Sequence, residues 1–198
     1  MSMVLTRHET RTLRLPARGI RLGVVADTHS RPHPNALQLL TAQKPAFILH
    51  AGDIGDLAVL DALENVAPLI VVRGNIDTRA HHLADSITLQ FESPQALLRI
   101  YLTHIAVART RLRTEARERA QAEQADMVIC GHSHVPLIAQ DGPVAVFNPG
   151  SIGPRRFRLP ITFGIADIHP QKGVSLHHID CETGVRWQPV PLHHPKAN

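Results

Sequence analysis

Short apolar runs rich in Val and Ile, each ended abruptly by polar residues, constrain the fold of this chain more than any other feature. The first, LGVVADTHS at residues 22–30, passes from apolar residues directly into Asp27, Thr28 and His29. Continuous apolar character over a short run is typical of a strand that is covered on both faces. Helix-like stretches separate the first of these runs, and this alternation predicts parallel strands joined by helical crossovers.

The same reasoning predicts the other elements of an α/β (α+β) fold. Strands are expected over 20–27, 46–53, 68–75, 87–93, 96–104 and 126–132, followed by hairpin strands over 135–140, 144–150, 161–169 and 173–181. Helices are expected over 34–43, 57–66 and 109–124. Asp141-Gly142 is a typical hairpin turn. We expect an N-terminal extension or edge strand over 1–19, a single domain over 20–185 and a C-terminal tail over 186–198.

Length and composition indicate a soluble globular protein. The chain has 198 residues, of which 43% are hydrophobic and 19% are charged, and these values suit one domain with a sizeable core. Apolar runs of membrane-spanning length do not occur, and the first residues lack the apolar segment of a secretory signal. Two cysteines make no disulfide framework, and Cys130 lies in an apolar run as a reduced core residue would. A cytoplasmic location is therefore expected.

The charge pattern argues against nucleic acid as a partner, although the formal net charge is +4. The arginines are scattered, and aromatic residues make up only 4% of the chain. The 14 histidines are more informative, since histidine is the commonest metal ligand among side chains.

Five of the predicted strands end in Asp, His or Asn. These residues are Asp27, His29, Asp53, Asn75, His104, His132 and His134. Because ligand sites in open α/β sheets form outside the carboxyl ends of the strands, we expect these side chains to meet at one edge of the sheet. Residues two apart on a strand point to the same side, so D-x-H and H-x-H can each direct two ligands to one place.

The chemistry of this set predicts a metal site. Carboxylate, amide oxygen and imidazole without thiolate suit Mn²⁺, Fe or Zn²⁺. Seven ligands are too many for one ion that keeps an open position, but they suit two ions that share one carboxylate. Such a pair can hold a hydroxide and bind a phosphate during in-line attack.

Each motif has an ordinary alternative when it is taken alone. Asp53 could cap a helix, Gly74-Asn75 could be a simple turn, and His104 could be a core or surface histidine. The occurrence of all the motifs at predicted strand ends within one domain favours a common site.

The ordered motifs D-x-H, GD, GN, H and GHxH resemble those of the calcineurin-like metallophosphoesterases. GHSHVP and NPGSIGPRR, at residues 131–136 and 148–156, resemble the small bacterial and archaeal phosphodiesterase branch, which includes YfcE-like and Vps29-like proteins. The resemblance covers about residues 20–180. It implies a four-layer sandwich of two mixed β-sheets flanked by helices, and a metal-dependent phosphoesterase.

The resemblance also implies a role for each motif residue. The first metal ion would be bound by Asp27, His29 and His134, and the second by Asn75, His104 and His132. Asp53 would bridge the two ions, and a bridging water or hydroxide would be the nucleophile. Mn²⁺ is the implied cofactor, with Ni²⁺, Fe or Zn²⁺ as alternatives. We expect Asn75, His104 and Asp77 to take part in catalysis, Asp77 by orienting a ligand or a water, or else only as a helix cap.

Two positions depart from the family pattern. The protein phosphatases have a proton-donating histidine after GN, where this chain has Ile76. Loss of a poor alkoxide is harder without that acid, so a broad serine/threonine phosphatase is not expected. Relatives commonly have glycine after the histidine that corresponds to His104, whereas this chain has Ile105. We expect Ile105 to alter the shape of that loop and substrate access past His104.

Substrate contacts are less strongly indicated by the sequence. Arg155 and Arg156 could hold a phosphate oxygen, and so could Arg109, but exposed surface arginines are the favoured alternative. The expected function is hydrolysis of a small or activated phosphate diester. A non-catalytic Vps29-like assembly scaffold and a nuclease are the alternatives. A small phosphate ester is the expected partner, no membrane partner is expected, and a homo-oligomer such as a dimer stays open.

Overall fold

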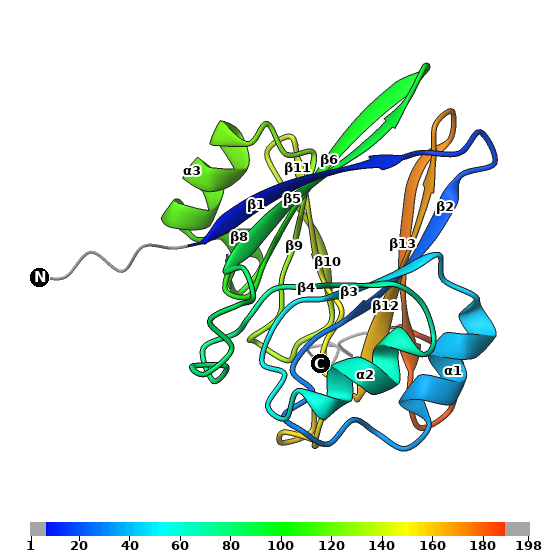
Figure 1. Cartoon of the computed structure of the whole chain (residues 1–198), viewed down its shortest axis with the longest axis vertical. Coiled ribbons are helices and arrows are strands. Elements are labelled where there is room, and N and C mark those ends of the chain that lie inside the picture. Colours follow the sequence, from blue (N-terminus) through cyan, green and yellow to red (C-terminus); the bar gives the residue numbers. More distant parts are fainter. Residues whose placement is uncertain (1–6, 189–198) are drawn as a thin grey trace, which may run out of the picture.

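In the computed structural model, which describes residues 7–188, two six-stranded β-sheets pack face to face with helices on their outer sides (Figure 1). The β6 sheet contains, in spatial order, β1 (His8–Arg14), β5 (Ser86–Ser93), β6 (Ala96–Thr103), β9 (Met127–Ile129), β11 (Val144–Asn148) and β10 (Leu137–Asp141). The β2 sheet contains β14 (Arg186–Trp187), β13 (Gly173–Asp180), β12 (Thr162–His169), β2 (Ile20–Val25), β3 (Phe47–His50) and β4 (Leu69–Val71).

Helices cover the outer face of each sheet, so the molecule has four layers. Strands β2, β3 and β4 are parallel and are joined through α1 (Ala36–Gln43) and α2 (Ala58–Glu64), as the alternating pattern predicts. Leu40 of α1 and Leu63 of α2 are buried in one cluster with Phe163 of β12. Helix α3 (Thr114–Ala122) buries Ala116 and Ala120 against the β6 sheet. The expected fold class, a sandwich of two mixed sheets flanked by helices, is confirmed.

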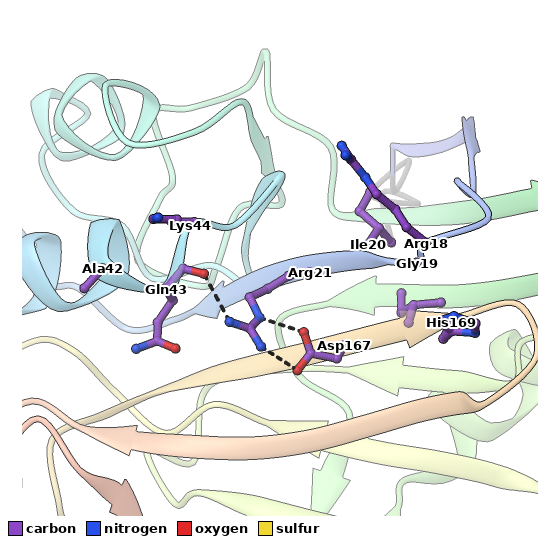
Figure 2. Close-up of a pocket in the computed structure, with 10 residues that line it drawn as sticks. Arg18, Gly19, Ile20, Arg21, Ala42, Gln43, Lys44, Asp167 and His169 are labelled. Carbon is purple, nitrogen blue, oxygen red and sulfur yellow. Dashed lines mark hydrogen bonds and ion pairs between the residues drawn. The ribbon is translucent and has the colours of Figure 1, made fainter.

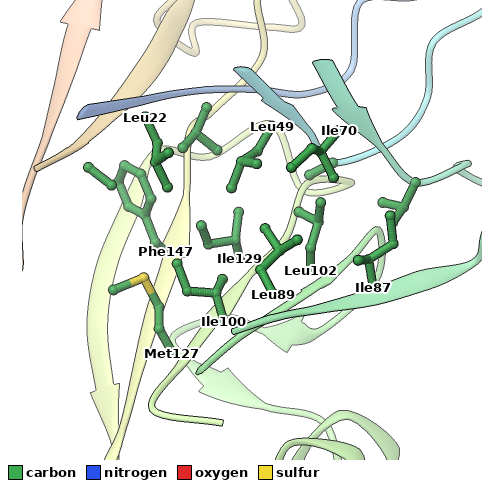
Figure 3. Packing of buried hydrophobic residues seen from close by; sticks show 14 of the residues in the cluster. Leu22, Leu49, Ile70, Ile87, Leu89, Ile100, Leu102, Met127, Ile129 and Phe147 are labelled. Carbon is green, nitrogen blue, oxygen red and sulfur yellow. The ribbon is translucent and has the colours of Figure 1, made fainter. Parts of the chain in front are cut away.

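The main hydrophobic core lies between the two sheets (Figure 3). Leu22 and Leu49 of the β2 sheet point toward Leu89, Ile100 and Ile129 of the β6 sheet. The alternation along β2 explains its continuous apolar sequence. Leu22 and Val24 enter this inter-sheet core, whereas Val25 enters the cluster under the helices.

The prediction of one helix over 109–124 is wrong at its start. Residues 107–112 form a small hairpin of β7 (Val107–Ala108) and β8 (Arg111–Leu112), and the helix begins only at Thr114. The backbone N–H of Leu112 donates to the Asp141 carboxylate at 2.8 Å, and the Leu112 side chain is buried under α3. These long-range contacts outweigh the local helical spacing of Leu112, Ala116 and Ala120.

The two ends of the described part of the chain add strands to both sheets. Strand β1 pairs in parallel with β5 and forms an edge of the β6 sheet. Strand β14 pairs with β13, so the interval predicted as a tail begins with a short strand. The rest of that interval, residues 189–198, lies outside the described residues. Among residues 7–188, none of the helices has the length and apolarity needed to span a bilayer.

Truncation of the Phe147 side chain tests the inter-sheet core. Phe147 is fully buried, and Gly164 on β12 has no room for a Cβ because this atom would lie 2.4 Å from the Phe147 ring. Phe147→Ala should lower the free energy of unfolding by about 3–5 kcal/mol, measured by urea denaturation. Leu97→Ala, at a side chain that is 45% exposed, should change it by less than about 0.5 kcal/mol. Equal effects of the two variants would contradict the assigned core.

Candidate metal centre

The polar residues at the strand ends come together where the carboxyl ends of the two sheets meet. Asp27 and His29 follow β2, Asp53 follows β3, Asn75 follows β4, His104 follows β6, and His132 and His134 follow β9. The sequence predicts one edge of one sheet, but the structure builds the site from three strands of the β2 sheet and two of the β6 sheet. All seven predicted residues are part of it.

The first group of side chains contains Asp27, His29 and His134, whose ligand atoms all lie within 4.8 Å of one another. The Nε2 atoms of His29 and His134 are 3.2 Å apart. Asp27 Oδ1 lies 3.4 Å from His134 Nε2, and both of these side chains are buried. One carboxylate and two imidazoles therefore point at a common centre.

The second group contains Asp53, His104 and His132 and meets the same 4.8 Å limit. Asn75 joins it, since its Oδ1 atom is 3.0 Å from both His104 Nε2 and His132 Nδ1. Asp53 lies between the two groups. Its Oδ1 is 3.1 Å from His104 Nε2, and its Oδ2 is 3.8 Å from His29 Nε2.

Most of these side chains have the ionisation state that a metal site needs at neutral pH. Burial lowers the pKa of His29 and of His132, and burial together with the charge of Arg156 lowers the pKa of His134 to about 4. Burial is the largest single effect on Asp53 and opposes its ionisation. The hydrogen bond and charge of His104, the Ile76 N–H and the charge of His29 together outweigh it and bring the pKa of Asp53 to about 2. Neutral imidazoles and carboxylates are the forms that bind metal ions.

Asp27 and His104 are the two exceptions among the charged groups. Burial raises the pKa of Asp27 to about 7. Burial is the largest single effect on His104 and would lower its pKa. The hydrogen bond with Asp53, the charges of Asp27 and Asp53, and the Ala51 carbonyl together outweigh burial, so this pKa is raised. The Ala51 carbonyl, 2.8 Å from His104 Nδ1, can only accept, so Nδ1 carries a proton and Nε2 faces the cluster. A divalent cation at this cluster would favour the Asp27 carboxylate and replace a proton on His104 Nε2.

The donor set fits a bound cation. Two neutral imidazole nitrogens that face each other at 3.2 Å have no favourable contact unless a proton or a cation lies between them. The donors are nitrogen and oxygen atoms only, which suit Mn²⁺, Fe, Zn²⁺ or Ni²⁺.

The backbone at the site is strained. Five of the seven residues have φ in the left-handed region: Asp27 (55°), His29 (45°), Asp53 (57°), His132 (68°) and His134 (58°). Each such residue costs on the order of 1–3 kcal/mol, so the surrounding structure must hold it in place. Gly74 allows the close approach of two of these loops, because a Cβ there would lie 2.2 Å from Asp53 Oδ1.

Asp77, predicted to take part in catalysis, contacts backbone and not the donor atoms. Its Oδ1 accepts hydrogen bonds from the N–H groups of Ile54 and Gly55, each at 3.0 Å. Its Oδ2 accepts from Gly74 N–H at 2.7 Å. Buried Asp77 therefore ties the loop that carries Asp53 to the loop that carries Asn75, and the structure gives it a positioning role.

The NPGS turn supports the opposite side of the site. Asn148 Nδ2 donates to the Gly131 carbonyl at 2.7 Å and to Ser133 Oγ at 3.1 Å, which holds the GHSH loop. Ser151 Oγ donates to the backbone carbonyl of Asp27 at 2.9 Å. In the sequence this turn is only a motif that resembles the small phosphodiesterase branch, and the structure identifies its hydrogen bonds.

A buried Thr28–His50 pair was missed by sequence reasoning. Thr28 Oγ1 lies 3.1 Å from His50 Nε2 and donates to the Ile54 carbonyl at 2.9 Å. His50 Nδ1 accepts from Gly52 N–H at 3.1 Å. The pair joins the loops after β2 and β3, and the only signal for it in the sequence was a pair of polar residues at the ends of buried strands.

The three arginines considered for substrate binding lie at different distances from the cluster. Arg155 pairs with Glu182 and donates to the Leu159 carbonyl, so its guanidinium is held outside the cluster. Arg109 lies at the turn of the β7–β8 hairpin with a φ of 59°. Arg156 approaches the site most closely, with Nη2 3.5 Å from His29 Nε2. The pairing of Arg155 depends on a residue 27 positions away, which local sequence could not show.

The two departures from the family motifs have separate consequences. Ile76 is 42% exposed, and its backbone N–H donates to Asp53 Oδ1 at 3.2 Å. Ile105 lines a separate surface cavity of about 630 Å³ beside β1 and α3, together with Tyr101 and Thr103. None of the seven strand-end residues lines this cavity, so the Ile105 side chain lies outside the donor cluster.

Another cavity, of about 600 Å³, lies at the opposite ends of the β2-sheet strands (Figure 2). It is lined by Arg18, Arg21, Lys44 and Asp167, among others. Arg21 donates from Nε to Asp167 Oδ1 at 2.6 Å, so part of its positive charge is compensated. Since Arg21 is near the amino end of β2 and Asp27 follows the carboxyl end, this cavity is separate from the metal centre.

Comparison with known proteins shows the family of this chain. The family model described as the calcineurin-like phosphoesterase superfamily domain matches residues 20–171. The chain belongs to this superfamily. The matched part of this calcineurin-like phosphoesterase contains every strand-end residue of the cluster, while β1 precedes it.

Relatives of this calcineurin-like phosphoesterase have been named in archaea and bacteria. A probable metallophosphoesterase of Methanocaldococcus jannaschii is 30% identical over 140 residues, which cover 66% of this chain and 67% of that protein. The phosphodiesterase YfcE of Escherichia coli K12 is 31% identical over 114 residues, which cover 55% of this chain and 58% of YfcE.

Solved structures share the fold at lower identity. Vacuolar Protein Sorting 29 from Cryptosporidium parvum superposes with a TM-score of 0.67 at 17% identity, covering 85% of this chain and 95% of that one. A structure described as a novel archaeal phosphodiesterase gives a TM-score of 0.63 at 22% identity, covering 81% and 99%. One fold thus occurs in proteins named as a phosphodiesterase and as a sorting protein.

Substitution of Asp77 tests its positioning role. Asp77→Asn turns amide hydrogens toward backbone N–H groups, so the loops of Asp53 and Asn75 should loosen. The affinity for Mn²⁺, measured by calorimetric titration of the metal-free full chain, should fall by about 10- to 100-fold. Asp167→Asn removes a partly exposed ion pair at the far end of the sheet and should leave this affinity unchanged. A folded Asp77→Asn protein with normal Mn²⁺ affinity would refute the role.

Proposed function

We propose that this calcineurin-like phosphoesterase is a metal-dependent phosphodiesterase that hydrolyses small or activated phosphate diesters. The observation that carries the proposal is the convergence of two donor groups on one shared carboxylate, that of Asp53. Membership of the superfamily supports hydrolysis of phosphate esters, and the phosphodiesterase names of its relatives support the diester class.

Two divalent ions would be held by the two groups. Asp27, His29 and His134 would bind the first ion, Asn75, His104 and His132 the second, and Asp53 both. Mn²⁺ is the proposed ion, with Ni²⁺, Fe and Zn²⁺ as alternatives. When bound, such ions supply Lewis-acid stabilisation of phosphate charge and lower the pKa of bound water.

The protein groups around the cluster favour a diester with a good leaving group. Ile76 occupies the position after Asn75 and carries no proton donor. A poor alkoxide would therefore leave slowly, whereas an aryl or other activated oxygen needs no acid. Arg156 is the cation placed to neutralise a phosphate oxygen near His29, since it reaches the first group while Arg155 is paired with Glu182.

The alternative functions predict different behaviour. A scaffold like the sorting proteins that share this fold would show no metal-dependent turnover, whereas this cluster holds a competent ligand at every position. A nuclease would cleave oligonucleotides faster than small diesters, and the chain has few aromatic residues for stacking several bases. The proposal also includes a cytoplasmic location and a homo-oligomer such as a dimer. The proposed partner is a small-molecule substrate, with no membrane or nucleic-acid partner.

Metal removal and replacement test the function. The purified full chain should hydrolyse bis(4-nitrophenyl) phosphate, lose this activity after chelation, and regain it with Mn²⁺, because the donor cluster has no other source of positive charge of that size. Release of nitrophenolate in a panel with Mn²⁺, Ni²⁺, Zn²⁺ and Mg²⁺ measures this. Equal rates with and without chelator would overturn the proposal.

Asp53 should be essential to that activity. Asp53→Asn keeps the size of the side chain but removes the charge between the two groups, and turnover should fall more than about a hundredfold, beyond the effect of residues that only orient ligands. Circular dichroism should report an intact fold, and Asp167→Asn serves as the matched control. If the Asp53→Asn enzyme keeps its activity, the Asp53 carboxylate is not the ligand shared by the two donor groups.

Arg156 and Arg155 form a matched pair for substrate binding. Arg156→Ala should lower kcat/KM for bis(4-nitrophenyl) phosphate by about 10- to 100-fold, the usual effect of a lost hydrogen bond to a charged group. Arg155→Ala removes a surface ion pair and should change kcat/KM less than about threefold. A larger loss of kcat/KM in Arg155→Ala than in Arg156→Ala would show that Arg155, and not Arg156, contacts the substrate.

A further inference from the structure

Phe157 is the most exposed of the large apolar side chains in the described part of the chain. Its side chain is 93% exposed, while the next, Val185, is 61% exposed. It lies between Arg156 and Arg158, both of which are exposed. An aromatic ring in this position gains no burial in the isolated chain, so packing does not explain it.

The backbone of Phe157 is also unfavourable. Its φ is 53°, in the left-handed region that bulky residues rarely adopt. The residue occupies a turn closed by a hydrogen bond from Leu159 N–H to the Arg156 carbonyl at 3.1 Å, where glycine or asparagine is the usual choice. Strain and exposure of an aromatic ring thus coincide in one residue, as they do at binding sites.

The loop that carries this turn packs against the metal centre. Gly153, at the start of this loop, packs so closely that a Cβ would lie 2.3 Å from the Asp27 carbonyl. Arg155 holds the far side of the turn through Leu159 and Glu182. Phe157 directly follows Arg156, so their Cα atoms are about 3.8 Å apart. The Nη2 atom of Arg156 lies 3.5 Å from His29 Nε2.

Two other exposed apolar residues directly follow residues of the cluster. Ile76, 42% exposed, comes directly after Asn75, and Val135, 44% exposed, comes directly after His134. Two of the seven large exposed apolar residues of the described chain thus directly follow residues of the cluster, and Phe157 follows Arg156. The surroundings of the cluster suit a substrate that has an apolar group beside its phosphate.

We infer that Phe157 determines substrate specificity by stacking on a nucleobase of a phosphodiester whose phosphate lies at the metal centre beside Arg156. This inference rests on the proposed function. Stacking accepts any flat aromatic base, and a single exposed ring suits recognition of one base and not of a longer strand.

Paired competitive inhibitors test this inference. AMP and ribose 5-phosphate share a phosphate and a sugar and differ by the base, and each is titrated against hydrolysis of bis(4-nitrophenyl) phosphate by the Mn²⁺-loaded full chain. AMP should inhibit the natural chain more strongly. In Phe157→Ala its inhibition constant should rise roughly 5- to 30-fold, the usual effect of a lost stacking contact, while that of ribose 5-phosphate stays unchanged.

Control variants separate aromatic stacking from other effects. Phe157→Trp should keep the advantage of AMP, Phe157→Leu should lose most of it, and Leu97→Ala, at an exposed residue far from the site in sequence, should behave as the natural chain does. Equal inhibition constants for the two ligands in the natural chain would overturn the inference. So would a Phe157→Ala protein that keeps the preference for AMP but changes its elution volume in size-exclusion chromatography, since Phe157 would then contact a second copy.

Failure of the proposed function would be seen separately. If the metal-loaded natural chain does not hydrolyse the diester, the same two ligands are titrated calorimetrically against the natural chain and the Phe157 variants. Tighter binding of AMP that depends on Phe157 would support base recognition without catalysis, and equal binding of both ligands would overturn it.

Discussion

The packing of the two sheets on each other is the constraint on which the metal centre depends. The donors after β2, β3 and β4 belong to one sheet and those after β6 and β9 to the other, so no single sheet contains the cluster. Leu22, Leu49 and Ile129, in the core between the sheets, belong to the same strands that end in ligands. A close-packed core has little freedom to shift, so it sets the spacing of the donor atoms at the strand ends.

This arrangement has a cost that the neighbouring loops offset. Left-handed backbone at Asp27, Asp53 and His132 turns these side chains toward a common centre, but it is unfavourable for residues other than glycine. Hydrogen bonds that buried Asp77 accepts and buried Asn148 donates hold these loops from two sides. The bound cation would add to them, because each donor gains a favourable partner that the metal-free protein lacks. Part of the free energy of folding thus offsets the backbone strain, and the donor side chains are preorganised before substrate binds.

Much of the fold and of the candidate site could be predicted from local sequence. Continuous apolar runs marked the buried strands, and alternation with helical stretches indicated the parallel connections of β2, β3 and β4. The errors arose where long-range contacts decided the outcome. Residues 109–112 have helical spacing but form a hairpin turn held by Asp141. Arg155 and Arg156 are adjacent residues of the same type, so the sequence does not distinguish them. In the structure Arg155 pairs with Glu182, whereas Arg156 lies beside His29.

The sequence by itself determined the chemistry of the site: which side chains end the strands, that they are oxygen and nitrogen ligands, and that a residue without a proton donor follows Asn75. Residue type and spacing along one strand are local properties, and a local pattern is enough to read them. Only the tertiary structure decided that two sheets supply the ligands, that Arg156 and not Arg155 lies beside His29, and that Phe157 is exposed. Those features depend on contacts between residues far apart in the chain, which form only when the apolar faces of both sheets are buried together.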